Sequence, residues 1–145
     1  MSKLIKLTPE EILVLNLTKL GEFLVLGLHI IESNDQKIDL DKELVEKALH
    51  ILQNRHPLLR ASLEFNSNKT FFKIHESCEI NPDNEYELLD SKDQLIPKLE
   101  IFNCKLFDYT KENSKLWRTC VYAYDEKGCK QYAVGIVMPL FITGN

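Results

Sequence analysis

The sequence predicts an α+β fold, a two-layer sandwich in which a mixed β-sheet carries helices packed mainly on one face. Three patterns lead to this prediction. A helical pattern at 41–55 precedes an alternating pattern at 58–65, an almost continuous apolar run occupies 22–32, and β-rich segments lie at 116–124 and 129–138. Helical and strand periods therefore occur along one chain, as expected when helices pack onto a sheet.

The helix and strand between residues 41 and 65 form the clearest unit. Asp41 can cap the helix, and Pro57 lacks an N–H, so the helix should end near Asn54 or Arg55. The strand 58–65 should follow after this sharp corner, because apolar and polar residues alternate there. The apolar stripe of the helix is Leu44, Ala48, Ile51 and Leu52, widened by Val45 and Leu49.

The preceding part of the chain predicts a helix and a central strand. Thr8 and Glu11 form a capping box around Pro9, which predicts a helix from Pro9 to about Lys19. Gly21 should end this helix. The apolar run at 22–32 is typical of a central strand that is covered on both faces.

Two hairpins and a further helix are expected after the corner. The strand 58–65 should pair with 70–76 across a four-residue loop at 66–69. The β-rich segments near the carboxyl end should pair across Asp125–Gly128, with Gly128 in a left-handed conformation. A short strand at Tyr86–Leu89 and a helix from Lys92 to about Cys104 complete the prediction; Leu95, Leu99 and Phe102 form one face of that helix.

Length and composition indicate a single ordinary globular domain spanning 1–145. The chain has 145 residues, 44% hydrophobic and 28% charged, with a net charge of −4. A nucleic-acid-binding domain normally needs a basic face, so this class is not expected. No apolar run reaches the roughly 18 residues of a membrane span, and the amino end does not resemble a signal peptide, so we expect a cytoplasmic protein.

The cysteines predict neither a disulfide framework nor a metal site. Their spacing contains no C-x-x-C pair, which a zinc knuckle would need. In a reducing compartment we expect free structural thiols. The four cysteines are Cys78, Cys104, Cys120 and Cys129.

Two short motifs point to a known family. The corner reads Arg55-His56-Pro57-Leu58-Leu59-Arg60, and Phe107-Asp108 precedes Leu116-Trp117-Arg118. The first resembles the R-H-P-x-L-R segment, and the second the F-D … L-W-R segment, of the condensation-domain and alcohol acetyltransferase superfamily, the relatives of chloramphenicol acetyltransferase. The resemblance covers the amino-terminal half of that fold only. It implies acyl transfer from an acyl-CoA donor, with no further cofactor.

The same resemblance places the reaction in the loop that follows the terminal hairpin. There the family carries H-H-x-x-x-D-G, whose second His is the general base. This chain has Met138-Pro139-Leu140-Phe141-Ile142-Thr143-Gly144, in which only Gly144 fits. Pro139 occupies the position of the base and cannot accept a proton. The resemblance therefore implies no catalytic residue here, while Met138 and Phe141 would line a residual substrate cavity.

The four histidines are the candidates for an alternative base. His29 lies in the apolar run, His50 should face solvent, His56 belongs to the Pro corner, and His75 should end an edge strand. None has a neighbouring Ser or Cys in sequence with a third orienting group. Structural roles are therefore expected for all four. Arg60 and Arg118 should pair with carboxylates, and Trp117 should be a core residue.

Three functions remain open from the sequence. The first is an acyltransferase-like half-domain without a working base, which associates with a second copy or with a complementing second half-domain through the apolar ending Val134–Ile142. The second is an active acyl-CoA-dependent O- or N-acyltransferase that uses His29 or a partner's base. The third is a non-catalytic module that binds acyl-CoA or a partner.

Overall fold

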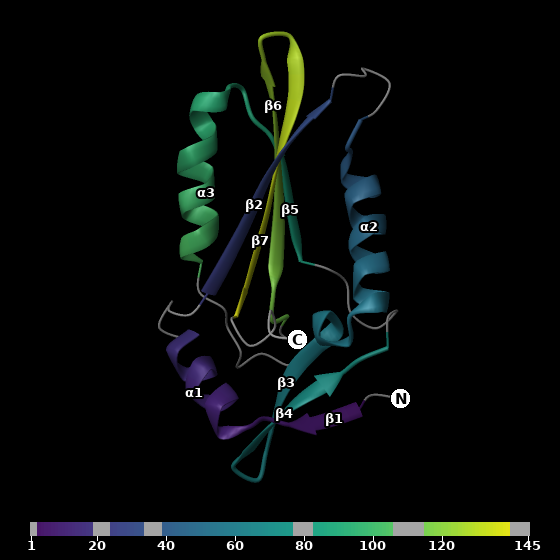
Figure 1. Ribbon diagram of the computed structural model, residues 1–145, viewed down its shortest axis with the longest axis vertical. Helices are drawn as coiled ribbons and strands as arrows, with labels where there is room; N and C mark the ends of the chain where they lie inside the picture. The colour runs from purple at the N-terminus through teal and green to yellow at the C-terminus, as the bar shows by residue number, and fades with distance from the viewer. Residues whose placement is uncertain (1–2, 19–23, 34–38, 77–82, 106–114, 140–145) are drawn as a thin grey trace.

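The computed structural model contains two β-sheets and three α-helices within its described part (Figure 1). It describes residues 3–18, 24–33, 39–76, 83–105 and 115–139.

The larger sheet has four strands in the order β2-β7-β6-β5. Strand β7 pairs antiparallel with β2 and with β6, whereas β5 pairs parallel with β6. The sheet is therefore mixed, as predicted, and the α+β class is confirmed. Its strands are β2 (Leu24–Ser33), β5 (Asn84–Leu88), β6 (Arg118–Glu126) and β7 (Cys129–Pro139).

Helices α2 (Lys42–Arg55) and α3 (Leu95–Cys104) cover opposite faces of this sheet (Figure 1). Successive residues of β6 alternate between the two layers, so Cys120 faces α3 while Val121 faces α2. This differs from the expected arrangement of helices mainly on one face. Because every residue of β6 from Arg118 to Tyr124 is buried, both faces of the strand need a cover.

Each helix meets the sheet through its own apolar cluster, and both clusters include β6 and β7. The α2-side cluster consists of Val45, Leu49, Leu59, Trp117, Val121, Ala123 and Tyr132. The α3-side cluster consists of Leu89, Leu95, Leu99, Phe102, Cys120, Tyr122, Tyr124, Ala133 and Val137.

The smaller sheet is antiparallel and has the order β1-β4-β3. Helix α1 (Pro9–Thr18) packs against it through Leu15, which lies in one cluster with Leu63 and Phe72. Its strands are β1 (Lys3–Lys6), β3 (Ala61–Asn66) and β4 (Lys69–Ile74).

The predicted helix starts are confirmed in atomic detail. The amide of Glu11 donates to Thr8 Oγ1 at 3.2 Å, and the amide of Thr8 donates to Glu11 Oε1 at 2.9 Å. This is the reciprocal capping box. Asp41 Oδ1 accepts from the amide of Leu44 at 2.8 Å, and α2 ends at Arg55, two residues before Pro57. Gly21 lies outside the described residues.

The buried stripe of α2 is rotated from the predicted one. Val45, Leu49 and Gln53 are buried, whereas Leu44 and Ile51 are 46% and 56% exposed. The i, i+4, i+8 row therefore faces the sheet. Gln53 can be buried in this row because its side-chain Nε2 donates a hydrogen bond to a backbone carbonyl, as described below.

The corner after α2 also differs from the prediction. Residues Pro57–Arg60 form a short 3-10 helix, η1, and the strand begins only at Ala61. The loop of the first hairpin has two residues, Ser67 and Asn68, instead of four. Both have positive φ, 49° and 64°, which matches the twist of the paired strands. The second hairpin has Gly128 in the predicted left-handed conformation, at φ 77°, but its loop is also shorter than predicted. Glu126 pairs with Cys129, so only Lys127 and Gly128 lie between the strands.

The predicted third helix is present in two parts. A 3-10 turn, η2 (Lys92–Gln94), leads into α3, and Leu95, Leu99 and Phe102 are buried as expected. Pro97 lies in the first turn of α3, where an N–H would have no intrahelical partner. None of the described helices combines the length and the apolar character that a membrane crossing requires.

The prediction for the apolar run at 22–32 was wrong in one respect. The strand forms, but β2 lies at the edge of the sheet, and its described residues 26–32 are all exposed. The central positions belong to β6 and β7, so residues 134–139 of the apolar ending that was expected to be exposed are buried or half-buried in the middle of the sheet. An apolar run indicates that the side chains of a strand are favourably buried, but it does not reveal whether elements of the same chain bury them.

Candidate functional site

The end of β7 is where the family resemblance places the chemistry. Pro139 is the last residue of β7, lies opposite Leu24 of β2 and is buried. Met138 is half-buried and packs against the α2-side cluster. The two residues therefore belong to the sheet and its packing. Phe141, Thr143 and Gly144 lie outside the described residues.

The two motif segments meet at one backbone carbonyl. Trp117 Nε1 donates to the carbonyl oxygen of Leu59 at 2.8 Å, and Gln53 Nε2 donates to the same oxygen at 3.2 Å. Trp117 is 1% exposed, as expected for a core residue. Helix α2, η1 and β6 are thus connected at the corner.

Arg60 binds backbone carbonyls and not the carboxylate that was expected. Its Nε donates to the carbonyl of His75 at 2.8 Å, and its Nη1 donates to the carbonyl of Gln53 at 2.9 Å. The last carbonyls of a helix lack intrahelical partners and carry partial negative charge. Arg60 therefore closes the carboxyl end of α2 and ties it to the end of β4.

The histidines are separated from the end of β7. His29 is exposed on β2 opposite Val134, five residues from the Leu24–Pro139 pair, which is about 17 Å along the strand. His56 is exposed and belongs to the corner, and His50 is half-buried where solvent exposure was expected. His75 follows β4, the middle strand of its sheet, so the expected edge position was wrong.

The structure brings His75 together with a serine that the sequence did not single out. His75 Nε2 lies 2.8 Å from Ser62 Oγ, although thirteen residues separate them. The hairpin register of β3 and β4 was the signal that would have found this pair. His75 is 6% exposed and Ser62 is 1% exposed. A nucleophile needs access to substrate, so this buried contact is a structural one.

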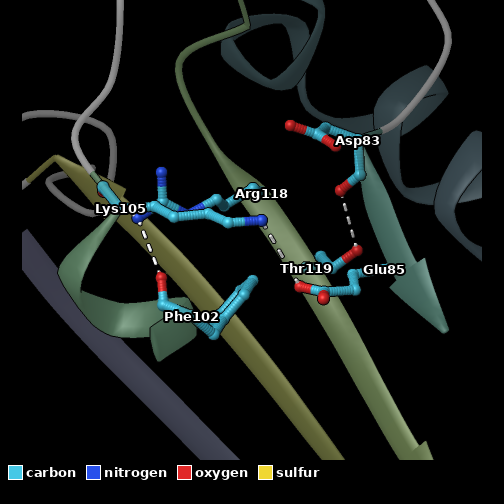
Figure 2. A pocket seen from close by; sticks show the side chains of 6 residues that line it. All are labelled: Asp83, Glu85, Phe102, Lys105, Arg118 and Thr119. Carbon is cyan, nitrogen blue, oxygen red and sulfur yellow. Dashed lines mark hydrogen bonds and ion pairs between the residues drawn. The ribbon is translucent and has the colours of Figure 1, made fainter. Parts of the chain in front are cut away.

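A hollow of about 290 Å³ lies beside the end of α3 (Figure 2). Arg118 Nη2 donates to the carbonyls of Phe102 and Lys105, and its guanidinium lies 5.5 Å from the Phe102 ring centre. Arg118 thus caps the end of α3 through backbone carbonyls, as Arg60 caps the end of α2. The hollow is lined by Asp83, Glu85, Phe102, Lys105, Arg118 and Thr119.

Lys105, Glu85 and Thr119 of this hollow contact neighbouring polar groups. Lys105 Nζ lies 3.8 Å from Glu85 Oε2. Thr119 Oγ1 donates to the carbonyl of Asp83 at 3.1 Å and to Asn84 Oδ1 at 2.8 Å. These contacts explain how β5 is held beside β6, and they place no nucleophile beside a base.

The described cysteines have free thiols, as predicted. Cys104 is exposed, Cys129 is half-buried and Cys120 is buried. Burial raises the pKa of the Cys120 thiol to about 12, so this thiol stays protonated near neutral pH and is a poor nucleophile. Cys78 lies outside the described residues, and the described part of the chain shows no group of three metal-ligating side chains.

Comparison of the fold with solved structures finds condensation domains. The chain aligns with a four-domain nonribosomal peptide synthetase bound to AMP and glycine, with a TM-score of 0.71 and 16% identity, over 96% of this chain and 10% of that chain. It aligns with the starter condensation domain of rhizomide synthetase with a TM-score of 0.70 and 11% identity, over 94% and 30%.

The chain has a condensation-domain-like fold. The condensation domain of the monacolin K polyketide synthase gives a TM-score of 0.67 at 13% identity, over 92% of this chain and 29% of that chain. The chain thus spans about 30% of the length of these two condensation-domain chains. No family model and no curated protein matches the sequence. At these identities the likeness shows the fold alone.

Proposed function

We propose that this chain is an acyltransferase-like half-domain of the condensation type that does not catalyse acyl transfer by itself. The observation that supports this proposal most directly is the position of Pro139. It ends β7, the strand whose following loop carries the reactive motif in the family, and it falls at the position of the general base. Proline has no titratable atom, so the general-base contribution, typically about 10²–10⁴-fold, has no carrier there.

The placement of the described histidines supports the same proposal. A replacement base must lie within hydrogen-bonding distance of the proton that it removes. His29 is about 17 Å along the strand from Pro139. His75 lies in the smaller sheet's buried layer against Ser62.

An acyl-transfer assay tests the proposal. The chain is incubated with acetyl-CoA or a longer acyl-CoA and with a panel of alcohols and amines, and release of free CoA is followed. We expect no rate above that of the acyl-CoA without protein. Turnover that disappears in His29→Ala or in another single His→Ala variant would establish the alternative, an active acyltransferase with a different base.

A binding function without turnover is the second candidate, since the fold is retained while the base position holds Pro139. Thermal unfolding with and without acyl-CoA separates the two non-catalytic functions. A ligand present at 100 times its dissociation constant stabilises the folded state by about 2.7 kcal/mol. An unchanged melting temperature would favour a function through protein partners, either a second copy or a complementing half-domain, for which the exposed residues of β2 provide the surface.

A further inference from the structure

Strand β2 is an apolar sheet edge without the features that usually protect such edges. It runs for ten residues, Leu24–Ser33, in an uninterrupted antiparallel register with β7. It contains neither Pro nor Lys, and its register shows no bulge. Proline, lysine and bulges are the common means by which proteins stop an edge strand from pairing. The outer side of β2 can therefore accept another strand.

The apolar side chains of β2 are exposed beside fully buried neighbours. Leu26, Leu28 and Ile30 are 39%, 43% and 50% exposed. Their cross-strand partners on β7 include Val137 and Ala133, which are both 0% exposed. The apolar layer on the α3 side of the sheet thus continues beyond β7 onto β2, where the described chain does not cover it.

The pattern of β2 is symmetric about Leu28. Two antiparallel strands related by a two-fold axis perpendicular to the sheet place residues of the same face opposite each other. If the axis passes beside Leu28, Leu28 faces Leu28 of the second copy, and Leu26 faces Ile30. Each of the three exposed aliphatic residues on this face then lies opposite an aliphatic residue of the second copy, and such apolar cross-strand pairs stabilise a sheet.

The opposite face of β2 is compatible with the same register. Gly27 there faces His29 of the second copy, so the smallest residue lies opposite the largest. An added Cβ at Gly27 would meet no atom within 4 Å in the single chain, so there is space beside it. Glu32, the charged residue of the described strand, falls outside the central pairs. The register therefore buries no like-charge pair.

We propose that two copies of this chain associate through antiparallel pairing of their β2 strands, centred on Leu28, and so join their larger sheets into one. This inference rests on the proposed function, which leaves the protein partner open, and it identifies that partner as a second copy of the chain. It does not depend on the absence of catalysis, because the acyl-transfer assay and the association state are measured separately.

The association state is measured by size-exclusion chromatography with light scattering over a range of concentrations. We expect the wild-type chain to reach twice the 16.9 kDa mass of one chain. Leu28→Lys places two ammonium groups opposite each other on the axis, and should weaken the dimer at least about 100-fold. Ile101→Lys is the matched control, because Ile101 is an aliphatic residue on α3 that is 62% exposed; its dimer should persist.

A cross-linking experiment tests the register without relying on a charged variant. In a background in which Cys78, Cys104 and Cys129 are serine, Leu28→Cys should form a disulfide-linked dimer under mild oxidation. Directly opposite Cα atoms lie about 4.5–5.5 Å apart, which a disulfide can span. Leu26→Cys should remain unlinked, because its counterpart lies at least about 13 Å away along the strands.

The results of these experiments decide whether a second copy or a different chain pairs with β2. A wild-type chain that stays monomeric at all concentrations would refute the proposal and leave β2 to a different chain. A dimer that persists in Leu28→Lys and fails to cross-link through Leu28→Cys would also refute it, since the copies then meet elsewhere. If Leu28→Lys loses its circular dichroism signal, the cross-linking result alone decides.

Discussion

The indole of Trp117 donates its Nε1–H to the carbonyl oxygen of Leu59 at 2.8 Å, in a position where both residues are buried. The two residues are 58 positions apart in sequence. They belong to the two segments that resemble the condensation superfamily. The hydrogen bond shows that these segments form one packing unit, in which the residue immediately before β6 contacts the corner at the end of α2.

Replacing Trp117 with Phe should therefore destabilise the fold. Trp117→Phe removes the donor and part of the ring volume, while Gln53 still donates to the Leu59 carbonyl. We expect a loss of about 1–3 kcal/mol in the free energy of unfolding. Because Trp117 is the only tryptophan, unfolding in urea is followed by circular dichroism. A midpoint equal to that of the wild type would show that the contact does not stabilise the corner.

Gly135 should tolerate no side chain. A Cβ at this position would lie 2.7 Å from Cys120 Sγ on the neighbouring strand. Gly135→Ala should destabilise by about 1–3 kcal/mol through overpacking, and Cys120→Ala in the same chain should recover much of this loss. Gly27→Ala is the matched control in the same sheet, because no atom lies within 4 Å of its added Cβ. Equal effects at both glycines would contradict the explanation.

Ser62 should matter for stability and not for chemistry. Ser62→Ala removes the hydroxyl that lies 2.8 Å from His75 Nε2 in a buried layer. We expect an unfolding free energy lower by about 1–3 kcal/mol. Ser67→Ala in the exposed hairpin loop is the control for loss of a serine hydroxyl. Labelling of the wild type by an active-site serine reagent, lost in Ser62→Ala, would instead identify a reactive serine.

Stability should fall at alkaline pH in part because of Cys120. Its pKa is raised by burial from 9.0 to about 12 in the folded chain. Between these two pH values the folded state keeps a thiol proton that the unfolded state loses. The contribution of Cys120 to the free energy of unfolding is therefore complete below about pH 9 and is lost as pH rises towards 12. The melting temperature should therefore decline above pH 9, and Cys120→Ala should reduce the slope. An equal slope in the wild type and in Cys120→Ala would contradict this explanation.

Local sequence patterns determined the helix starts, the end of α2 before Pro57 and the pairing of the two hairpins. Caps, proline positions and strand alternation depend on neighbours in the chain, which is why Thr8 with Glu11, Asp41 and Gly128 behave as predicted. The buried stripe of α2 was displaced by one residue because the facing sheet, and not the helix alone, selects which side is covered.

The tertiary structure determined which strands pair and which side chains contact each other. Strand order put β2 at an edge, with β6 and β7 in the middle, because pairing between distant segments is not encoded in the period of any one of them. Folding also turned Arg60 and Arg118 towards helix-end carbonyls and brought Ser62 to His75. The sequence alone determined that Pro139, which cannot accept a proton, follows Met138. The fold determined that both residues end a strand whose neighbour, β2, is exposed over its described residues 26–32.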